Sequence, residues 1–141
     1  MNQYFEQMIL SATPMELVRL LFQKAIASTR AAREHLQNGR ISERCAAVNN
    51  TYMVLHELMS SLRPDQAPDL ARRLKSLYAY MQRRLLDANL KQQDEPLAEV
   101  LGLLMTLAEP WNALSDPAPP PSRTWSAGLP GEDSPGIALS A

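Results

Sequence analysis

The sequence predicts an all-α protein: an antiparallel four-helix up-down bundle with an N-terminal arm and a disordered C-terminal tail. Three observations lead to this fold class. Apolar residues recur at helical spacing in four segments, the connections between these segments are short and polar, and more than half of the eleven prolines lie beyond residue 114. Short connections force successive helices to run antiparallel. We therefore expect an arm at residues 1–13, the bundle at 14–114 and the tail at 115–141.

The first helix has a defined start in the stretch SATPMELVRLLFQKAI, residues 11–26. Thr13 can accept a hydrogen bond from the backbone N–H of Glu16, whose side chain can reach back to complete a capping box. Pro14 suits the first helical position, and Asn38-Gly39 supplies a stop. The core stripe expected on this helix consists of Val18, Leu21, Ala25, Ala32 and Leu36, flanked by Leu17, Phe22 and Thr29.

The second helix is predicted over residues 41–62, where apolar residues alternate in steps of three and four. Its stripe is Cys45, Val48, Tyr52, Leu55, Met59 and Leu62. The segment RPDQAP ends this pattern, because neither Pro64 nor Pro68 suits a helix interior.

The third helix is predicted over residues 69–90 and the fourth from Pro96 to Trp111. The third has the stripe Leu70, Leu74, Leu77, Met81, Leu85 and Ala88. The fourth has the stripe Leu97, Val100, Leu101, Leu104, Leu107 and Trp111. We expect Pro110 to kink the last turn of the fourth helix or to fray it.

The last segment, SDPAPPPSRTWSAGLPGEDSPGIALSA, shows little periodicity and is dense in Pro, Gly and Ser. Such a composition cannot offset the entropy of ordering by burying apolar surface. We therefore expect this segment to be disordered.

The composition limits the classes of protein and the compartment. A chain of 141 residues with 45% hydrophobic residues has room for one domain, and a net charge of −1 creates no overall field toward nucleic acid or an anionic membrane. No apolar run approaches the length of a membrane span, and the N-terminus lacks the pattern of a secretory signal. The single cysteine, Cys45, is compatible with a reducing cytosol. We expect a cytoplasmic protein without nucleic-acid binding or membrane insertion.

No residue pattern in the sequence predicts catalysis. A di-iron centre in a bundle would need Glu-x-x-His motifs, and neither His35 nor His56 has a glutamate three positions before it. Glycine-rich phosphate loops, nucleophile elbows and zinc-ligand spacings are absent from the sequence. We therefore predict no catalytic residues, no metal site, no cofactor and no enzymatic activity.

Several apolar residues lie off the predicted stripes, where a simple bundle would place polar ones. They are Leu20, Ala27 and Ala31 on the first helix, Val54 on the second, and Leu86 and Leu90 on the third. Either wider packing within the bundle or a binding surface for a partner explains them.

Arginines on the third helix suggest a different partner. Arg72, Arg73, Arg83 and Arg84, with Tyr78 and Tyr80 nearby, are consistent with an RNA-binding face. A solvated face whose arginine stems cover the edge of the core explains the same residues.

Three segments in register resemble the flagellar secretion chaperones of the FliS type. These segments are ILSATPMELVRLLFQKAI, LYAYMQRRLLDANL and EVLGLLMTLAEPW, and the resemblance covers about residues 4–114. It implies a cytoplasmic helical bundle that binds the C-terminal region of flagellin, prevents premature polymerisation, and delivers flagellin to the flagellar type III export apparatus. Components of the export gate would be further partners, and a homodimer is left open.

The expected partner surface combines the off-stripe residues with the arm. Tyr4, Phe5, Met8, Ile9 and Leu10 precede the Thr13 cap, and in the resembled family such an arm covers part of the client groove. Seven methionines would suit an adaptable surface. The residues predicted to contact a partner are Tyr4, Ile9, Leu10, Leu20, Ala27, Val54, Tyr78, Tyr80, Leu86 and Leu90.

Two alternatives remain open. One is a helical RNA-binding or regulatory adaptor that uses the arginine-rich face of the third helix. The other is a structural bundle that associates with itself.

Overall fold

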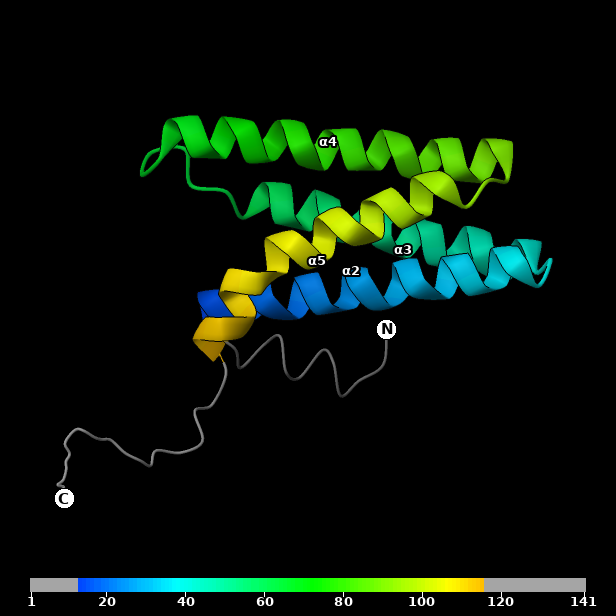
Figure 1. Cartoon of the computed structure of the whole chain (residues 1–141). Coiled ribbons are helices and arrows are strands. Elements are labelled where there is room, and N and C mark those ends of the chain that lie inside the picture. The colour runs from blue at the N-terminus through cyan, green and yellow to red at the C-terminus, as the bar shows by residue number, and fades with distance from the viewer. Residues whose placement is uncertain (1–12, 116–141) are drawn as a thin grey trace, which may run out of the picture. The chain divides into compact units, whose positions relative to one another are not determined.

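The computed structural model describes residues 13–115, and these residues form α-helices joined by short connections. The helices are α2 (Pro14–Gln37), α3 (Ile41–Ser60), α4 (Pro68–Lys91) and α5 (Glu95–Ser115). Figure 1 shows that successive helices reverse direction, with α3 between α2 and α4 and with α5 crossing diagonally. The predicted antiparallel four-helix bundle is confirmed. The predicted arm lies outside the described residues except for Thr13, and the predicted tail except for Ser115.

The boundaries of α2 follow from its capping residues. Oγ1 of Thr13 accepts from the backbone N–H of Glu16 at 3.2 Å, and Oε1 of Glu16 accepts from the backbone N–H of Thr13 at 3.2 Å. This capping box satisfies two backbone donors that a helix start leaves unpaired. At the other end, the Asn38 side chain donates to the carbonyl of Glu34, and Gly39 adopts a φ of +68°. The predicted start and stop of this helix are both confirmed.

All four helices contribute side chains to one core. The largest fully buried apolar side chains are Phe22, Leu55, Leu58, Met81, Leu85, Leu97, Val100 and Leu104. Two buried threonines join α2 to α3, because Oγ1 of Thr29 and Oγ1 of Thr51 lie 3.1 Å apart within hydrogen-bonding distance. The pair satisfies its own polar atoms, so it costs little in an apolar interior.

The buried face of α3 is wider than predicted and is rotated about the helix axis. Ala47, Thr51 and Leu58 are buried although they are absent from the predicted stripe, whereas Tyr52 and Met59 are only partly buried. The physical reason is that α3 packs against α2 on one side and α4 on the other. A helix with two neighbours buries more than the narrow stripe of a two-helix seam.

This geometry corrects two off-stripe predictions. Leu20 is 6% exposed and Val54 is 5% exposed, so both belong to the core. The prediction that they project away from it is wrong. The alternative explanation from the sequence, wider packing within the bundle, is the correct one for this pair.

The first turns of α4 and the last turns of α5 also differ from the predicted pattern. Leu70 is 56% exposed although it begins the predicted stripe, and the small Ala71 takes the buried position beside it. On α5 the helix continues past Pro110 to Ser115, so the prediction of a frayed last turn is wrong.

Candidate partner-binding groove

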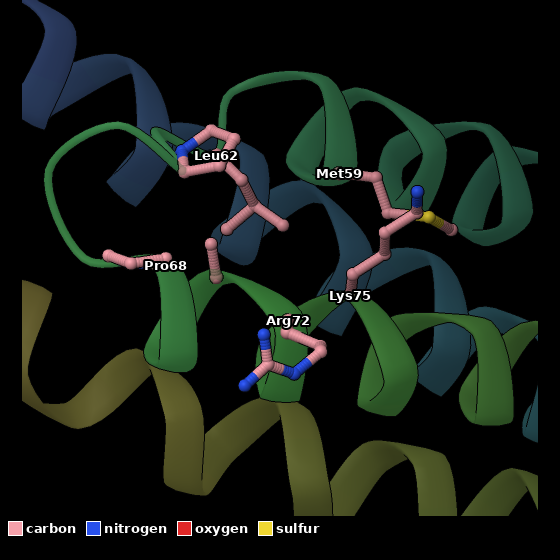
Figure 2. A pocket seen from close by; sticks show the side chains of 7 residues that line it. Met59, Leu62, Pro68, Arg72 and Lys75 are labelled. Atoms are coloured by element: carbon pink, nitrogen blue, oxygen red, sulfur yellow. The ribbon is translucent and has the colours of Figure 1, made fainter.

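An open cavity of about 400 Å³ lies where α3 ends and α4 begins. Figure 2 shows Met59 and Leu62, from the end of α3 and the turn after it, facing Arg72 and Lys75 of α4. The complete lining is Met59, Leu62, Pro64, Pro68, Ala71, Arg72 and Lys75. The walls are therefore mostly apolar, and two cationic side chains stand on one of them.

The local sequence explains why the helices leave this space. Pro64 and Pro68 end one helical pattern and start the next, because each lacks a backbone N–H and Pro68 occupies the first turn of α4. Ala71 then faces α3 with a side chain too small to fill the gap. The long stems of Arg72 and Lys75 supply apolar wall while their charges stay at the rim.

Beyond the cavity, α3 and α4 stay in contact along the line where they meet. Nε2 of Gln82 donates to the carbonyl of Tyr52 at 3.2 Å, and farther along Nε of Arg44 donates to Oδ1 of Asn89 at 3.0 Å. Cys45 and Tyr52 along this line are only partly buried. We call the cavity, which is the hollowed part, together with this contact line the α3–α4 groove.

Exposed leucines of α4 extend the apolar surface beside this groove. Leu86 is 52% exposed and Leu90 is 82% exposed. At 100° per residue they lie on the same side of α4 as Arg72 and Lys75. From Lys75 to Leu90 the helix rises about 22 Å, which is the length of a helical segment of about 15 residues.

The charges at the rim of the cavity favour acidic groups. Lys75 has no ionic partner among residues 13–115, and Arg72 is paired only with the exposed Asp69 of its own helix. An exposed pair of this kind contributes little to stability and is easily exchanged. A partner carrying carboxylates beside apolar side chains would complement this rim.

Another cluster on α4 ties this helix to α5. Arg84 donates to Glu99 at 2.7 Å and Glu95 at 3.0 Å, and the hydroxyl of Tyr80 donates to Glu99 at 2.7 Å. The hydrogen bonds from Tyr80 and Arg84 hold the pKa of Glu99 below its usual value. Tyr80 and Arg84 are therefore engaged between helices of the bundle.

A second ion pair joins α2 to the connection before α5. Nε and Nη2 of Arg33 donate to the two carboxylate oxygens of Asp94, each at 2.8 Å. This bidentate pair lowers the pKa of Asp94 and raises the pKa of Arg33. Two carboxylates with lowered pKa values thus join helices of the bundle: Glu99 joins α5 to α4, and Asp94 joins the connection before α5 to α2.

Acid is therefore expected to destabilise the bundle. The ordinary pKa values are 4.5 for Glu99 and 3.8 for Asp94, and both values are lowered in the folded state. The unfolded chain then binds protons at a higher pH than the folded chain does, so the free energy of unfolding falls as the pH drops below about 4.5. Urea unfolding at pH 7 and in steps below pH 5 measures this decline.

The variant Glu99→Gln is expected to show a shallower decline, because one of the two shifted carboxylates is gone. Glu57→Gln is the matched control, since Glu57 is exposed on α3 and makes no ion pair within the described part of the chain. An identical acid dependence in Glu99→Gln and wild type would contradict this assignment.

The structure separates the predicted partner residues into three groups. Tyr4, Ile9 and Leu10 lie outside the described residues. Leu20, Val54 and Tyr78 lie in the core, so their predicted place on an accessible surface is wrong, and burial raises the pKa of Tyr78 to about 12. The remaining four retain some exposure: Ala27, Tyr80, Leu86 and Leu90.

Residues of the cavity were missed by the sequence patterns. Met59 and Leu62 fit a core stripe, while Arg72 and Lys75 resemble ordinary solvated charges. The two prolines that flank a break followed by Ala71 are the signal of an incompletely filled helix junction.

The four arginines of α4 do not form a single cationic face. Arg72 and Arg84 lie about 120° apart around the helix, and Arg84 is surrounded by Asp87, Glu95 and Glu99. The guanidinium carbon of Arg83 lies 5.9 Å from the centre of the Tyr80 ring. This arrangement disfavours the RNA-binding alternative, which needs a continuous basic stripe.

Two further findings concern residues 13–115. They contain no cluster of three His, Cys, Asp or Glu side chains placed to hold a metal ion. None of their helices combines the length and the apolar character needed to cross a membrane.

A packed helical bundle with an open, mostly apolar cavity belongs to a class of proteins that can bind another protein without catalysis. The chain belongs to the family described as flagellar protein FliS, whose sequence model matches residues 1–118.

Curated relatives agree with this family. A flagellar secretion chaperone FliS from Salmonella typhimurium is 33% identical over 114 residues, covering 80% of this chain and 84% of that protein. Flagellar secretion chaperone FliSB from Pseudomonas aeruginosa is 29% identical over 82% of this chain and 94% of its own length. The Escherichia coli FliS chaperone is 28% identical over 75% of this chain and 79% of its own length.

Proposed function

We propose that this protein is a cytosolic export chaperone that binds the C-terminal region of flagellin. Binding keeps flagellin from polymerising before export, and release occurs at the flagellar type III secretion apparatus, whose gate components are further partners. The observation that carries this proposal is the family match over residues 1–118, which includes the whole bundle. The protein acts by binding and has no catalytic role.

The α3–α4 groove supplies a physical basis for client binding. An amphipathic helix can lay its apolar face into such a groove, with anchors at i, i+3, i+4 and i+7. Met59 and Leu62 would receive one anchor in the cavity, and Leu86 and Leu90 would contact later turns of the client. Methionine adapts its shape to different apolar partners, which suits a chaperone surface.

The predicted partner residues differ in how readily they could contact the client. Leu86 and Leu90 contact the client without any rearrangement, whereas Leu20, Val54 and Tyr78 would need the core to open. Residues of the arm, Tyr4 among them, are proposed to lie against the client or to cover its groove.

Titration calorimetry with the C-terminal segment of flagellin tests the proposal. We expect one site and a negative heat-capacity change, because binding buries apolar surface. Affinity should persist between low and moderate salt, whereas RNA binding driven by phosphate contacts would collapse over that range. The absence of binding at micromolar concentrations would reject the assignment.

A further inference from the structure

The cavity of the α3–α4 groove lies at the end of the bundle where α2 begins. The up-down order places the start of α2, the junction of α3 with α4, and the later turns of α5 before residue 110 at one end (Figure 1). Residues 116–141 follow α5 and extend beyond the family match, which ends at residue 118. Residues 119–141, which lie beyond this match, are therefore a candidate occupant of the cavity.

We propose that residues 132–139, with the sequence EDSPGIAL, dock into this cavity of the same chain. Glu132 and Asp133 place two carboxylates beside each other, and the rim offers Lys75 and Arg72. Ile137 and Leu139 follow at a spacing that sends both side chains to one side of an extended segment. They would rest against Met59 and Leu62 on the apolar wall.

The charge pattern selects this segment within the tail. Residues 116–131 carry one acidic residue, Asp116, and one basic residue, Arg123. Only Glu132 and Asp133 combine adjacent acidic groups with apolar side chains a few residues away. The cavity has mostly apolar walls and a lysine at its rim that has no ionic partner among residues 13–115, which matches that combination.

The connecting chain is long enough and gives a high local concentration. Residues 116–131 contain five prolines, and a chain of this length would span about 22 Å as a Gly-rich coil and more where prolines extend it, which is at least about two helix diameters. When the linker length matches the span, the effective concentration is in the millimolar range. Weak contacts are then sufficient for docking.

Docking would shield part of the groove while no client is bound. This consequence rests on the proposed function, whereas the docking itself does not depend on it. A tail that occupies the cavity for about nine-tenths of the time would weaken the apparent client affinity by about tenfold. The client would displace the tail without any change in the fold.

Paramagnetic broadening in the full-length chain tests the docking without any flagellin. A nitroxide label is attached through Ser134→Cys in a Cys45→Ser background. We expect amide signals of Leu62 and Lys75 to lose intensity, while those of Gln37, at the other end of the bundle, keep theirs. Cavity amides that retain full intensity would overturn the proposal and would leave flagellin binding as an independent question.

Charge reversal supplies the second arm of the test. Arg72→Glu with Lys75→Glu should restore the lost intensity, and adding Glu132→Lys with Asp133→Lys should remove it again. Arg73→Glu is the matched control, because Arg73 is an exposed arginine on the same helix that does not line the cavity. Two results would contradict docking directed by charge. One is broadening that stays unchanged in the variant with Arg72→Glu and Lys75→Glu, and the other is an equal loss of broadening in Arg73→Glu.

Discussion

Replacing Leu85 by alanine is expected to lower the free energy of unfolding by about 2–5 kcal/mol. Its side chain is fully buried in the core, so truncation removes apolar contacts and leaves a cavity. Urea denaturation followed by circular dichroism measures the loss, provided that the dependence on urea keeps its slope.

Leu86→Ala is the matched control, because Leu86 is the next residue of α4 and is 52% exposed. We expect its free energy of unfolding to change by no more than about 0.5 kcal/mol, as is usual for surface positions. Equal losses in the two variants would mean that the register of α4 in the bundle is incorrect.

Met59→Glu is expected to weaken binding of the flagellin C-terminal segment by about 100-fold, equivalent to about 2.7 kcal/mol. Met59 lines the apolar cavity, and a carboxylate there would have to lose its hydration when an apolar client anchor enters. Calorimetry gives the ratio of dissociation constants for the variant and the wild type.

Met53→Glu provides the comparison for this variant. Met53 lies on the same helix and is 51% exposed, but it does not line the cavity. Its affinity for flagellin should stay within about threefold of the wild type, the range expected for a residue outside the centre of an interface. Thermal unfolding of both variants confirms that each is folded. If Met53→Glu weakened binding as much as Met59→Glu, the client surface would be elsewhere on α3.

The limits of the helices could be predicted because local chemistry determines them. The Thr13 capping box and the Asn38-Gly39 stop depend on residues close in sequence, and the structure agrees with both. The helix α4 begins at Pro68, one residue before the predicted start, because proline suits the first helical turn. The buried face of α3 depends on how many helices surround it. A periodic stripe does not contain that information, so Val54 was assigned to the wrong environment and the buried Thr51 was not identified.

The groove could be predicted only in part for a similar reason. Leu86 and Leu90 were identified because they lie off the stripe of their own helix, and they are exposed as expected. Met59 and Leu62 continue a regular stripe, and only the divergence of α3 and α4 around Ala71 turns them into a cavity wall. Such a feature arises from tertiary packing, so the sequence indicates it only weakly.

The central claim is that the α3–α4 groove receives the C-terminal segment of flagellin, and hydrogen exchange of the full-length chain tests it most directly. With saturating flagellin segment, we expect slower amide exchange in residues 57–75, which include the end of α3, the connection and the first turns of α4. Helix ends beside an open cavity unfold locally at low cost, so a bound client should suppress that opening. A saturated complex that leaves exchange in residues 57–75 unchanged, while slowing it elsewhere on the bundle, would contradict the claim.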